Sequence, residues 1–231
     1  MNQYLIQKFA ISPRIVSAQD CFDSLTPQER ELLARSKTEL IFHKGETIVK
    51  QGFVASHILY IEEGLAKLDV TNDGITSTVK ILPSHHFVGI ICTFASENLD
   101  FSSVALEPTR ISMIDINLFE GFLHQNGDFA CNIVRHMSAL TNDLIHHISR
   151  FSHKNIDGAL AILILEFYNI YNSEIFRLPL TRKEMADSIG YSKESVINTL
   201  SKFNKEKILG VWDKRIEILD MDRLLLISKA G

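Results

Sequence analysis

Residues 181–207 read Thr-Arg-Lys-Glu-Met-Ala-Asp-Ser-Ile-Gly-Tyr-Ser-Lys-Glu-Ser-Val-Ile-Asn-Thr-Leu-Ser-Lys-Phe-Asn-Lys-Glu-Lys. This stretch carries the most specific structural signal in the chain. Thr181 and Glu184 have the spacing of a capping box, in which a hydroxyl and a carboxylate satisfy backbone amides at a helix N-terminus. Gly190 suits the position after that helix, where a positive φ is wanted. Ser192 can cap a second helix. The stretch therefore predicts two short helices joined by a tight turn.

The second helix has two contrasting faces. Val196, Leu200 and Phe203 recur at helical spacing and should face inward. The other face carries short polar and basic side chains, which suit the donors and acceptors that base edges offer in the major groove. A helical hairpin with a solvated face is the plain alternative. The predicted DNA-contacting residues, including two from the segment that follows, are Arg182, Lys183, Ser192, Lys193, Glu194, Ser195, Asn198, Thr199, Lys202, Lys214 and Arg215.

The next segment favours DNA binding over the plain hairpin. Residues 208–212 and 216–218 have strand composition and flank a short polar turn. A β-hairpin directly after two such helices is typical of a winged helix. Lys214 and Arg215 at its tip are placed to meet phosphates.

Three segments carry a resemblance to a known family. They are Leu-Thr-Arg-Lys-Glu-Met-Ala at 180–186, Gly-Tyr-Ser-Lys-Glu-Ser-Val at 190–196 and Ile-Glu-Ile-Leu-Asp at 216–220. The C-terminal third thus resembles the DNA-binding domain of the cAMP receptor protein/FNR family of bacterial regulators. Other winged-helix families share pieces of this pattern, so the rest of the chain has to agree.

Length and charge are compatible with two domains. The chain has 231 residues and a net charge of −4, and it exceeds the commonest single-domain size of about 100–150 residues. Residues 1–151 hold 12 Lys/Arg against 17 Asp/Glu, whereas residues 152–231 hold 12 against 11. Electrostatic attraction to DNA would therefore come from a local stripe of cations rather than from the global charge.

The three cysteines, Cys21, Cys92 and Cys131, are widely spaced and form no CxxC pair. This usage favours free thiols in a reducing cytoplasm and argues against a disulfide framework or a metal cluster held by cysteines. The N-terminus lacks the features of a secretory signal, and no apolar run approaches the roughly 20 residues of a membrane span. We expect a cytoplasmic protein with no membrane contact.

Residues 24–115 have a different character from the C-terminal third. Short β-rich runs alternate with glycine corners, and Asn-Asp-Gly at 72–74 is a strong hairpin signal. Such spacing predicts a small antiparallel barrel or jelly roll. Lys-Gly-Glu at 44–46, Gln-Gly at 51–52 and Tyr-Ile-x-x-Gly at 60–64 resemble the cyclic-nucleotide-binding-type barrel of the same family. Proteins of the cupin class also have a jelly-roll fold, but the histidine spacing with which cupins bind a metal ion does not occur in this sequence.

Residues 128–151 read as one long helix with an apolar seam, which predicts a dimerisation helix where the family has one. A core helix inside one domain is the alternative. The predicted fold class is α+β, with a sensor barrel domain at 1–127, a dimerisation helix at 128–152 and a winged helix-turn-helix domain at 153–231. The predicted dimer seam is Phe129, Ile133, Met137, Leu140, Leu144, Ile148 and Phe151.

The effector region departs from the family pattern. Where cAMP-binding members have a Glu that holds the ribose, Ile90 stands here; where they have the phosphate-binding Arg, Phe101 stands here. A buried phosphate without its guanidinium would be left unpaired, so we expect neither cAMP nor cGMP as effector. An apolar ligand and a pocket filled by its own side chains both stay open. The predicted pocket residues are Phe87, Gly89, Ile90, Ile91, Phe94, Phe101, Ser102, Ser103, Leu140 and Leu144.

No cofactor, metal ion or catalytic residue is predicted. Haem is an alternative because His85, His86 and Cys92 flank the pocket segment. An enzyme is not expected, since no metal-ligand spacing or nucleophile–base pattern stands out. Two further hypotheses stay open: a ligand- or haem-binding sensor whose DNA binding is weak or lost, and a protein-interaction scaffold.

The predicted DNA-recognition helix also departs from the family pattern. Family members often have Glu-x-x-x-Arg on the recognition helix; here Glu194 is kept and Asn198 replaces the arginine. Asn suits adenine where Arg suits guanine, so we expect adenine to be favoured at that position, with Glu194 accepting from cytosine. The resulting hypothesis is a homodimeric transcription regulator that binds a palindromic operator, contacts RNA polymerase and responds to an unidentified small-molecule effector. Residues 1–20 carry no motif that we can interpret.

Overall fold

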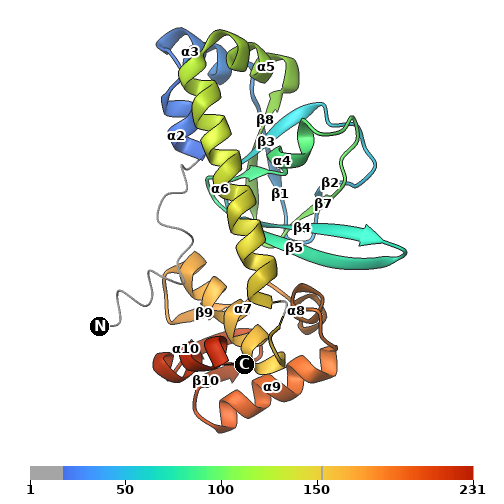
Figure 1. The fold of residues 1–231 in the computed structure, drawn as a ribbon, viewed down its shortest axis with the longest axis vertical. Coiled ribbons are helices and arrows are strands. Elements are labelled where there is room, and N and C mark those ends of the chain that lie inside the picture. The colour runs from blue at the N-terminus through green and yellow to red at the C-terminus, as the bar shows by residue number, and fades with distance from the viewer. Residues whose placement is uncertain (1–17, 152, 231) are drawn as a thin grey trace. The chain divides into compact units, whose positions relative to one another are not determined.

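The computed structural model describes residues 18–151 and 153–230, without the side chains of Ile91 and Arg150 (Figure 1). The chain divides into two compact units, Met1–Ile145 and His146–Gly231, and the boundary falls inside a long helix. The predicted α+β class is confirmed, because a sheet domain precedes the long helix and a helix-turn-helix follows it. None of the helices in the described ranges is long and apolar enough to span a bilayer.

Unit 1 contains two four-stranded sheets with the strand orders β1-β8-β3-β6 and β2-β7-β4-β5. All strand pairs are antiparallel, and consecutive strands are distributed over both sheets, which is the jelly roll expected from the sequence. The strands are β1 (Thr38–Phe42), β2 (Thr47–Val49), β3 (His57–Glu63), β4 (Leu65–Asn72), β5 (Ile75–Pro83), β6 (Phe87–Val88), β7 (Ser102–Ala105) and β8 (Thr109–Asp115).

The helices of unit 1 are α2 (Ala18–Asp23), α3 (Pro27–Ser36), α4 (Ile90–Thr93), α5 (Ile116–Gln125) and the first part of α6 (Gly127–Phe151). The predicted hairpin at Asn72 is confirmed: β4 and β5 are joined there, and Asp73 and Gly74 both have positive φ, 51° and 78°. These values match the mirror-image turns that fit the right-handed twist of the flanking strands.

Strand β3 is covered on both of its faces. Leu59 and Ile61 point into the barrel, where they join a core cluster with Val88 and Phe101. Ile58 and Tyr60 point to the opposite face and belong to a second core cluster. The helices complete that second cluster with Ala18, Cys21, Phe119, Phe122, Phe129 and Ile133. Double coverage explains why β3 reads as a continuous apolar run rather than an alternating one.

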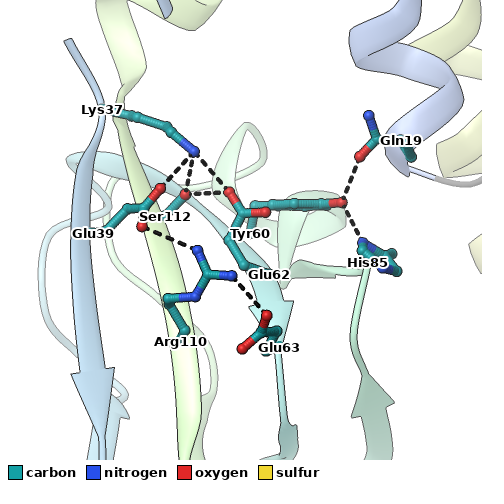
Figure 2. Close-up of polar contacts among 9 residues, drawn as sticks. All are labelled: Gln19, Lys37, Glu39, Tyr60, Glu62, Glu63, His85, Arg110 and Ser112. Atoms are coloured by element: carbon teal, nitrogen blue, oxygen red, sulfur yellow. Dashed lines mark hydrogen bonds and ion pairs between the residues drawn. The ribbon is translucent and has the colours of Figure 1, made fainter. Parts of the chain in front are cut away.

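A polar network crosses the strands β1, β8 and β3 (Figure 2). The Lys37 ammonium lies 2.9 Å from the Glu62 carboxylate and 2.8 Å from that of Glu39. The Arg110 guanidinium bridges Glu39 and Glu63 at 3.1 and 2.9 Å. Such pairs contribute about 0.2–1 kcal/mol each near a surface, so the network ties the strands together without dominating stability.

Unit 2 is built around α7 (Ile156–Tyr171), which Asn155 caps by accepting a hydrogen bond from the Gly158 amide at 3.0 Å. Residues 158–165 are all buried, because α8, α9 and α10 pack around this helix. The remaining elements are α8 (Arg182–Ile189), α9 (Lys193–Lys205), α10 (Met221–Ala230) and a three-stranded sheet of β9 (Ile175–Arg177), β10 (Leu209–Trp212) and β11 (Arg215–Ile218).

A buried polar cluster lies within unit 1, between β5, β6 and α6. Lys80 of β5 forms an ion pair with Asp143 of α6, and Asp143 is only 4% exposed. Burial lowers the pKa of His86, whose Nδ1 donates to the Ser84 carbonyl oxygen at 3.0 Å. The nearby charges of His136 and Lys80 lower this pKa further, although Ser84 and Asp143 act in the opposite direction.

The lowered pKa of His86 makes the stability of unit 1 depend on pH. A histidine has an ordinary pKa of about 6.5 when unfolded, so the unfolded chain binds more protons just below that pH. The contribution of His86 is therefore fully present above about pH 6.5, and it is lost as the pH falls toward the lower folded pKa. We expect the free energy of unfolding to fall by at most about 1.4 kcal/mol per pH unit from this group.

Denaturant titrations at several pH values check this prediction. His86→Asn should flatten the acid limb of the stability curve, and His43→Asn, which replaces an exposed histidine, is the matched control. An acid limb of equal slope in the wild type and in His86→Asn contradicts the assignment.

Candidate nucleic-acid interface

Helix α8 begins with the capping box expected from the sequence. The Thr181 hydroxyl accepts from the Glu184 amide at 3.2 Å, and the Glu184 carboxylate accepts from the Thr181 amide at 2.7 Å. Gly190 ends the helix with a φ of 73°, in the left-handed region that glycine adopts without cost. Met185 and Ala186 are buried, so α9 packs against this face.

Helix α9 is the second helix of the motif, and Ser192 caps it by accepting from the Ser195 amide at 3.1 Å. Val196, Leu200 and Phe203 are buried, as expected. Of the residues predicted on its outer face, Lys193, Glu194, Asn198 and Lys202 are exposed and Ser195 is half-buried.

The prediction for Thr199 is wrong, because this side chain is only 5% exposed. It follows Val196 by three residues and precedes Phe203 by four, which places it on the buried face at 100° per residue. Ile197 was missed: it is 41% exposed and follows Glu194 by three residues. The three-residue spacing from Glu194, which places both residues on one helix face, would have identified Ile197.

Three of the predicted phosphate-binding cations already have partners within unit 2. The Arg182 guanidinium donates to the Asp213 carbonyl oxygen, and burial lowers its pKa. The Lys202 ammonium lies 2.5 Å from the Asp157 carboxylate, which raises the pKa of Lys202. Lys183 forms an ion pair with Asp187 one turn along α8. Arg182 therefore links α8 to the wing turn, and the two lysines are partly neutralised.

The wing consists of β10, β11 and the turn at Asp213. Trp212 pairs across the hairpin with Arg215, which in turn pairs with Arg177 of β9. Arg177 is a further cation beside the wing that the sequence prediction did not include, because a three-residue strand gives no periodic signal. Within the described part of the chain, Lys193, Lys214 and Arg215 have no carboxylate within ion-pair distance, so these cations are available to phosphates.

In the barrel, Phe101 stands where the resemblance places a phosphate-binding arginine. Its ring is 3% exposed and packs on Gly89, where an added Cβ would lie 1.9 Å from the Phe101 Cζ atom. Gly89 also has a φ of 68°, so both its conformation and the missing side chain permit this contact. The position of the absent guanidinium is thus filled by a phenyl ring.

The other predicted pocket residues are not all members of one core cluster. Phe87 and Ile90 belong to the helix-covered cluster, with Leu140 packed against it, whereas Phe101 belongs to the barrel cluster. Leu144 is half-buried and Phe94 is 38% exposed. The Ser102 hydroxyl accepts from the Gln51 amide at 3.0 Å, and the Ser103 hydroxyl is buried without a hydrogen-bond partner among the described residues. The side chain of Ile91 lies outside the described residues.

The residues named for haem have other contacts. The His85 ring lies 2.9 Å from the Tyr60 hydroxyl, whose other partner is Gln19 at 3.2 Å (Figure 2). Burial raises the pKa of the Cys92 thiol. In the ranges 18–151 and 153–230, no group of three or more His, Cys, Asp or Glu is arranged to hold a metal ion. Haem ligation stays an untested hypothesis.

The predicted dimer seam is wrong for Phe129 and Ile133. Both are at most 2% exposed and are buried in the core of unit 1, with Met137 and Leu140 packed against the same cluster. The alternative of a core helix therefore holds for this face of α6. Leu144 and Phe151 are half-buried, and the Phe151 ring lies 4.7 Å from that of His147.

A second apolar stripe lies on another face of α6. Val134, Ile145 and Ile148 are 63%, 59% and 58% exposed, and they recur at helical spacing. Within unit 1 this stripe borders a surface groove lined by Val134, Met137, Ser138, Thr141, Asn142 and Ile145. Of the predicted seam residues, Ile148 lies on this exposed stripe, and its part in a dimer stays a prediction.

A capped helix-turn-helix followed by a wing defines a DNA-binding protein of the winged-helix class. The sequence profile of the Crp-like helix-turn-helix domain matches residues 158–227, and that of the cyclic nucleotide-binding domain matches residues 39–126. The chain belongs to the Crp/Fnr family, whose members are DNA-binding transcription regulators rather than enzymes.

Relatives support this assignment along most of the chain. The anaerobic regulatory protein of Bacillus subtilis (strain 168) is 24% identical over 196 residues, which cover 82% of each chain. Transcriptional activator protein FnrA of Stutzerimonas stutzeri is 24% identical over 183 residues, 77% of this chain and 75% of the relative.

Solved structures share the fold. FixK2 from Bradyrhizobium japonicum matches with a TM-score of 0.74 at 18% identity, covering 84% of this chain and 98% of FixK2. A transcriptional regulator of the CRP/FNR family from Thermus thermophilus matches with a TM-score of 0.65 at 18% identity, covering 84% of this chain and 99% of that regulator.

The ion pairs of the interface predict unequal roles for two lysines. Lys193→Gln should reduce the slope of log affinity against log salt by about 1 per subunit, because one phosphate contact is lost. Lys183→Gln should change that slope less, since Lys183 is already paired with Asp187. Fluorescence anisotropy with a fixed duplex over a salt series measures both slopes. Equal changes in the two variants contradict the assignment.

Proposed function

We propose that the chain acts as a homodimer on a palindromic operator, in the cytoplasm and in contact with RNA polymerase. Residues 1–127 form the sensor domain, 128–152 the dimerisation helix and 153–231 the DNA-binding domain in this proposal. The observation that carries it is the capped α8–α9 motif, whose polar outer face and unpaired wing cations suit a major groove and its phosphates. Two copies related by a two-fold axis would read half-sites about one helical turn apart.

The exposed stripe of α6 supports the dimer. Val134, Ile145 and Ile148 are large apolar side chains that the fold of one chain leaves in water. Pairing two α6 helices along this stripe would bury them by ridges-into-grooves packing. The core-facing stripe cannot do this, because Phe129 and Ile133 are already enclosed.

The dimer proposal predicts different effects for two charge substitutions on α6. Ile145→Glu should raise the dimer dissociation constant at least about 100-fold, because an unpaired charge in an apolar interface costs several kcal/mol. Arg135→Glu is the control, since Arg135 is exposed away from the stripe. Sedimentation equilibrium gives the constants, and circular dichroism confirms the fold. A dimer of Ile145→Glu as tight as that of the control contradicts the proposal.

The exposed pair Glu194 and Asn198 supports reading of base edges. Both lie on the outer stripe of α9, where a side-chain amide can bond adenine in a bidentate manner and a carboxylate can accept from cytosine. We propose adenine at the position that Arg-bearing relatives would use for guanine.

Selection of bound duplexes from a random pool, with no added effector, tests the function and this assignment together. A palindrome with half-sites one turn apart is the expected result. Asn198→Ala should lose about 1–3 kcal/mol of preference for adenine at one half-site position and keep the others. Unchanged preferences at every position contradict the role of Asn198. Recovery of no sequence from folded dimer contradicts DNA binding by the effector-free protein.

Control of DNA binding by the barrel, through an effector other than a cyclic nucleotide, is also part of the proposal. The Phe101 ring on Gly89 supports the exclusion of cyclic nucleotides, because a phosphate there would meet a phenyl ring instead of a cation. If an effector is to shift the equilibrium between two arrangements of the DNA-binding domains, it must bind one arrangement more tightly than the other.

Ligand titrations test the exclusion of cyclic nucleotides. Neither cAMP nor cGMP at saturating concentration should change the unfolding temperature of the full chain or its affinity for the selected operator. Calorimetry provides an independent measurement, in which a saturable heat of binding would contradict the prediction. AMP, which shares the base and has an open phosphate, serves as the control ligand.

A further inference from the structure

The outer surface of α9 carries a single large apolar side chain. Every residue of this helix is described, and Ile197 alone among its large apolar residues is exposed, at 41%. Its helix-surface neighbours Lys193, Glu194 and Ser201 are charged or polar. The core contacts of α9 lie on another face, so the packing of unit 2 does not require an isoleucine here.

Helical geometry places Ile197 on the side of α9 that faces the wing. Asn204 follows it by seven residues and so lies within about 20° of the same direction. The Asn204 side-chain oxygen accepts from the Val211 amide of β10 at 3.1 Å, which fixes that direction. Lys202 marks the opposite flank by its ion pair with Asp157 of α7. Ile197 therefore lies beside Asn198 on the reading surface, toward the wing.

Thymine is the only one of the four bases that presents a methyl group in the major groove. Adenine, guanine and cytosine present donors and acceptors, whereas thymine adds a methyl group at C5. A polar edge covered by an isoleucine would lose its bonds to water without replacement, which is costly. A methyl group gains from the same contact. The β-branched side chain also has one strongly preferred rotamer in a helix, so little freedom is lost on binding.

We infer that Ile197 is a specificity-determining residue that reads a thymine through its methyl group, next to the base pair read by Asn198. This inference rests on the proposed DNA-binding function and deepens it. Each half-site of the operator then contains a thymine that no hydrogen bond from α9 specifies.

Replacing thymine by deoxyuridine in the selected operator tests the inference, because this change removes only the methyl group. Each thymine is replaced in turn, at symmetric positions of both half-sites. At one position the affinity of the wild type should fall about fourfold per half-site, the value for one buried methyl group. The remaining positions should show smaller changes.

Three variants connect the effect to Ile197. Ile197→Ala should bind the thymine and deoxyuridine operators equally well, and Ile197→Val should keep most of the discrimination. Ile175→Ala is the matched control, because Ile175 is 44% exposed in the same unit and lies on β9 instead of α9. It should discriminate like the wild type. Unfolding temperatures show that all variants are folded.

The outcomes separate the inference from the function on which it rests. Loss of discrimination in Ile197→Ala alone supports the inference. A wild type that is indifferent to every replacement, or an Ile197→Ala variant that still discriminates, overturns it and leaves the DNA-binding function intact. Failure to select any operator with folded dimer overturns DNA binding by the effector-free protein and, with it, the inference.

Discussion

The packing of α6 against the core of unit 1 is the contact on which the other features of this protein depend. Phe129 lies at the centre of an aromatic cluster, with its ring 5.2 Å from that of Phe119, and Ile133 follows one turn later. Removing such a buried aromatic side chain typically costs about 3–5 kcal/mol, so the rotation of the helix is firmly fixed. With that face buried, Val134, Ile145 and Ile148 necessarily point elsewhere. The surface available for the proposed dimer is thus set by the core.

The same core determines the interior of unit 1. Strand β3 contributes to a core cluster on each of its two faces, and Phe101 fills the barrel side against Gly89. Charge is kept at the junction with α6, where Lys80 pairs with Asp143 and His86 lies nearby. Breaking such a buried pair is costly because one charge would be left uncompensated. In the proposed regulator, any movement of α6 relative to the barrel would therefore have to displace apolar packing and maintain this pair.

Much of the fold could be predicted from the sequence, since local chemistry determines it. Thr181, Gly190 and Ser192 act through atoms a few residues away, and their geometry agrees with the sequence prediction. The hairpin at Asp73 follows the same rule. The predictions that failed concerned which way a helix faces. Thr199 and Phe129 both lie on apolar or mixed seams whose burial depends on neighbouring elements.

The order of elements, the helix caps and the wing follow from the amino-acid sequence. So does the presence of Ile90 and Phe101 where the family resemblance implies polar effector-binding residues. These features depend on residue type and on spacing along the chain, which are local properties. Three other features depend on the tertiary structure. Thr199 is buried while Ile197 is exposed, and Lys202 and Lys183 are paired with carboxylates. Helix α6 exposes Val134 to solvent and buries Ile133. The reason is physical. An apolar seam on a helix specifies that one face of the helix will be buried, but the neighbouring elements determine which side chains that face packs against.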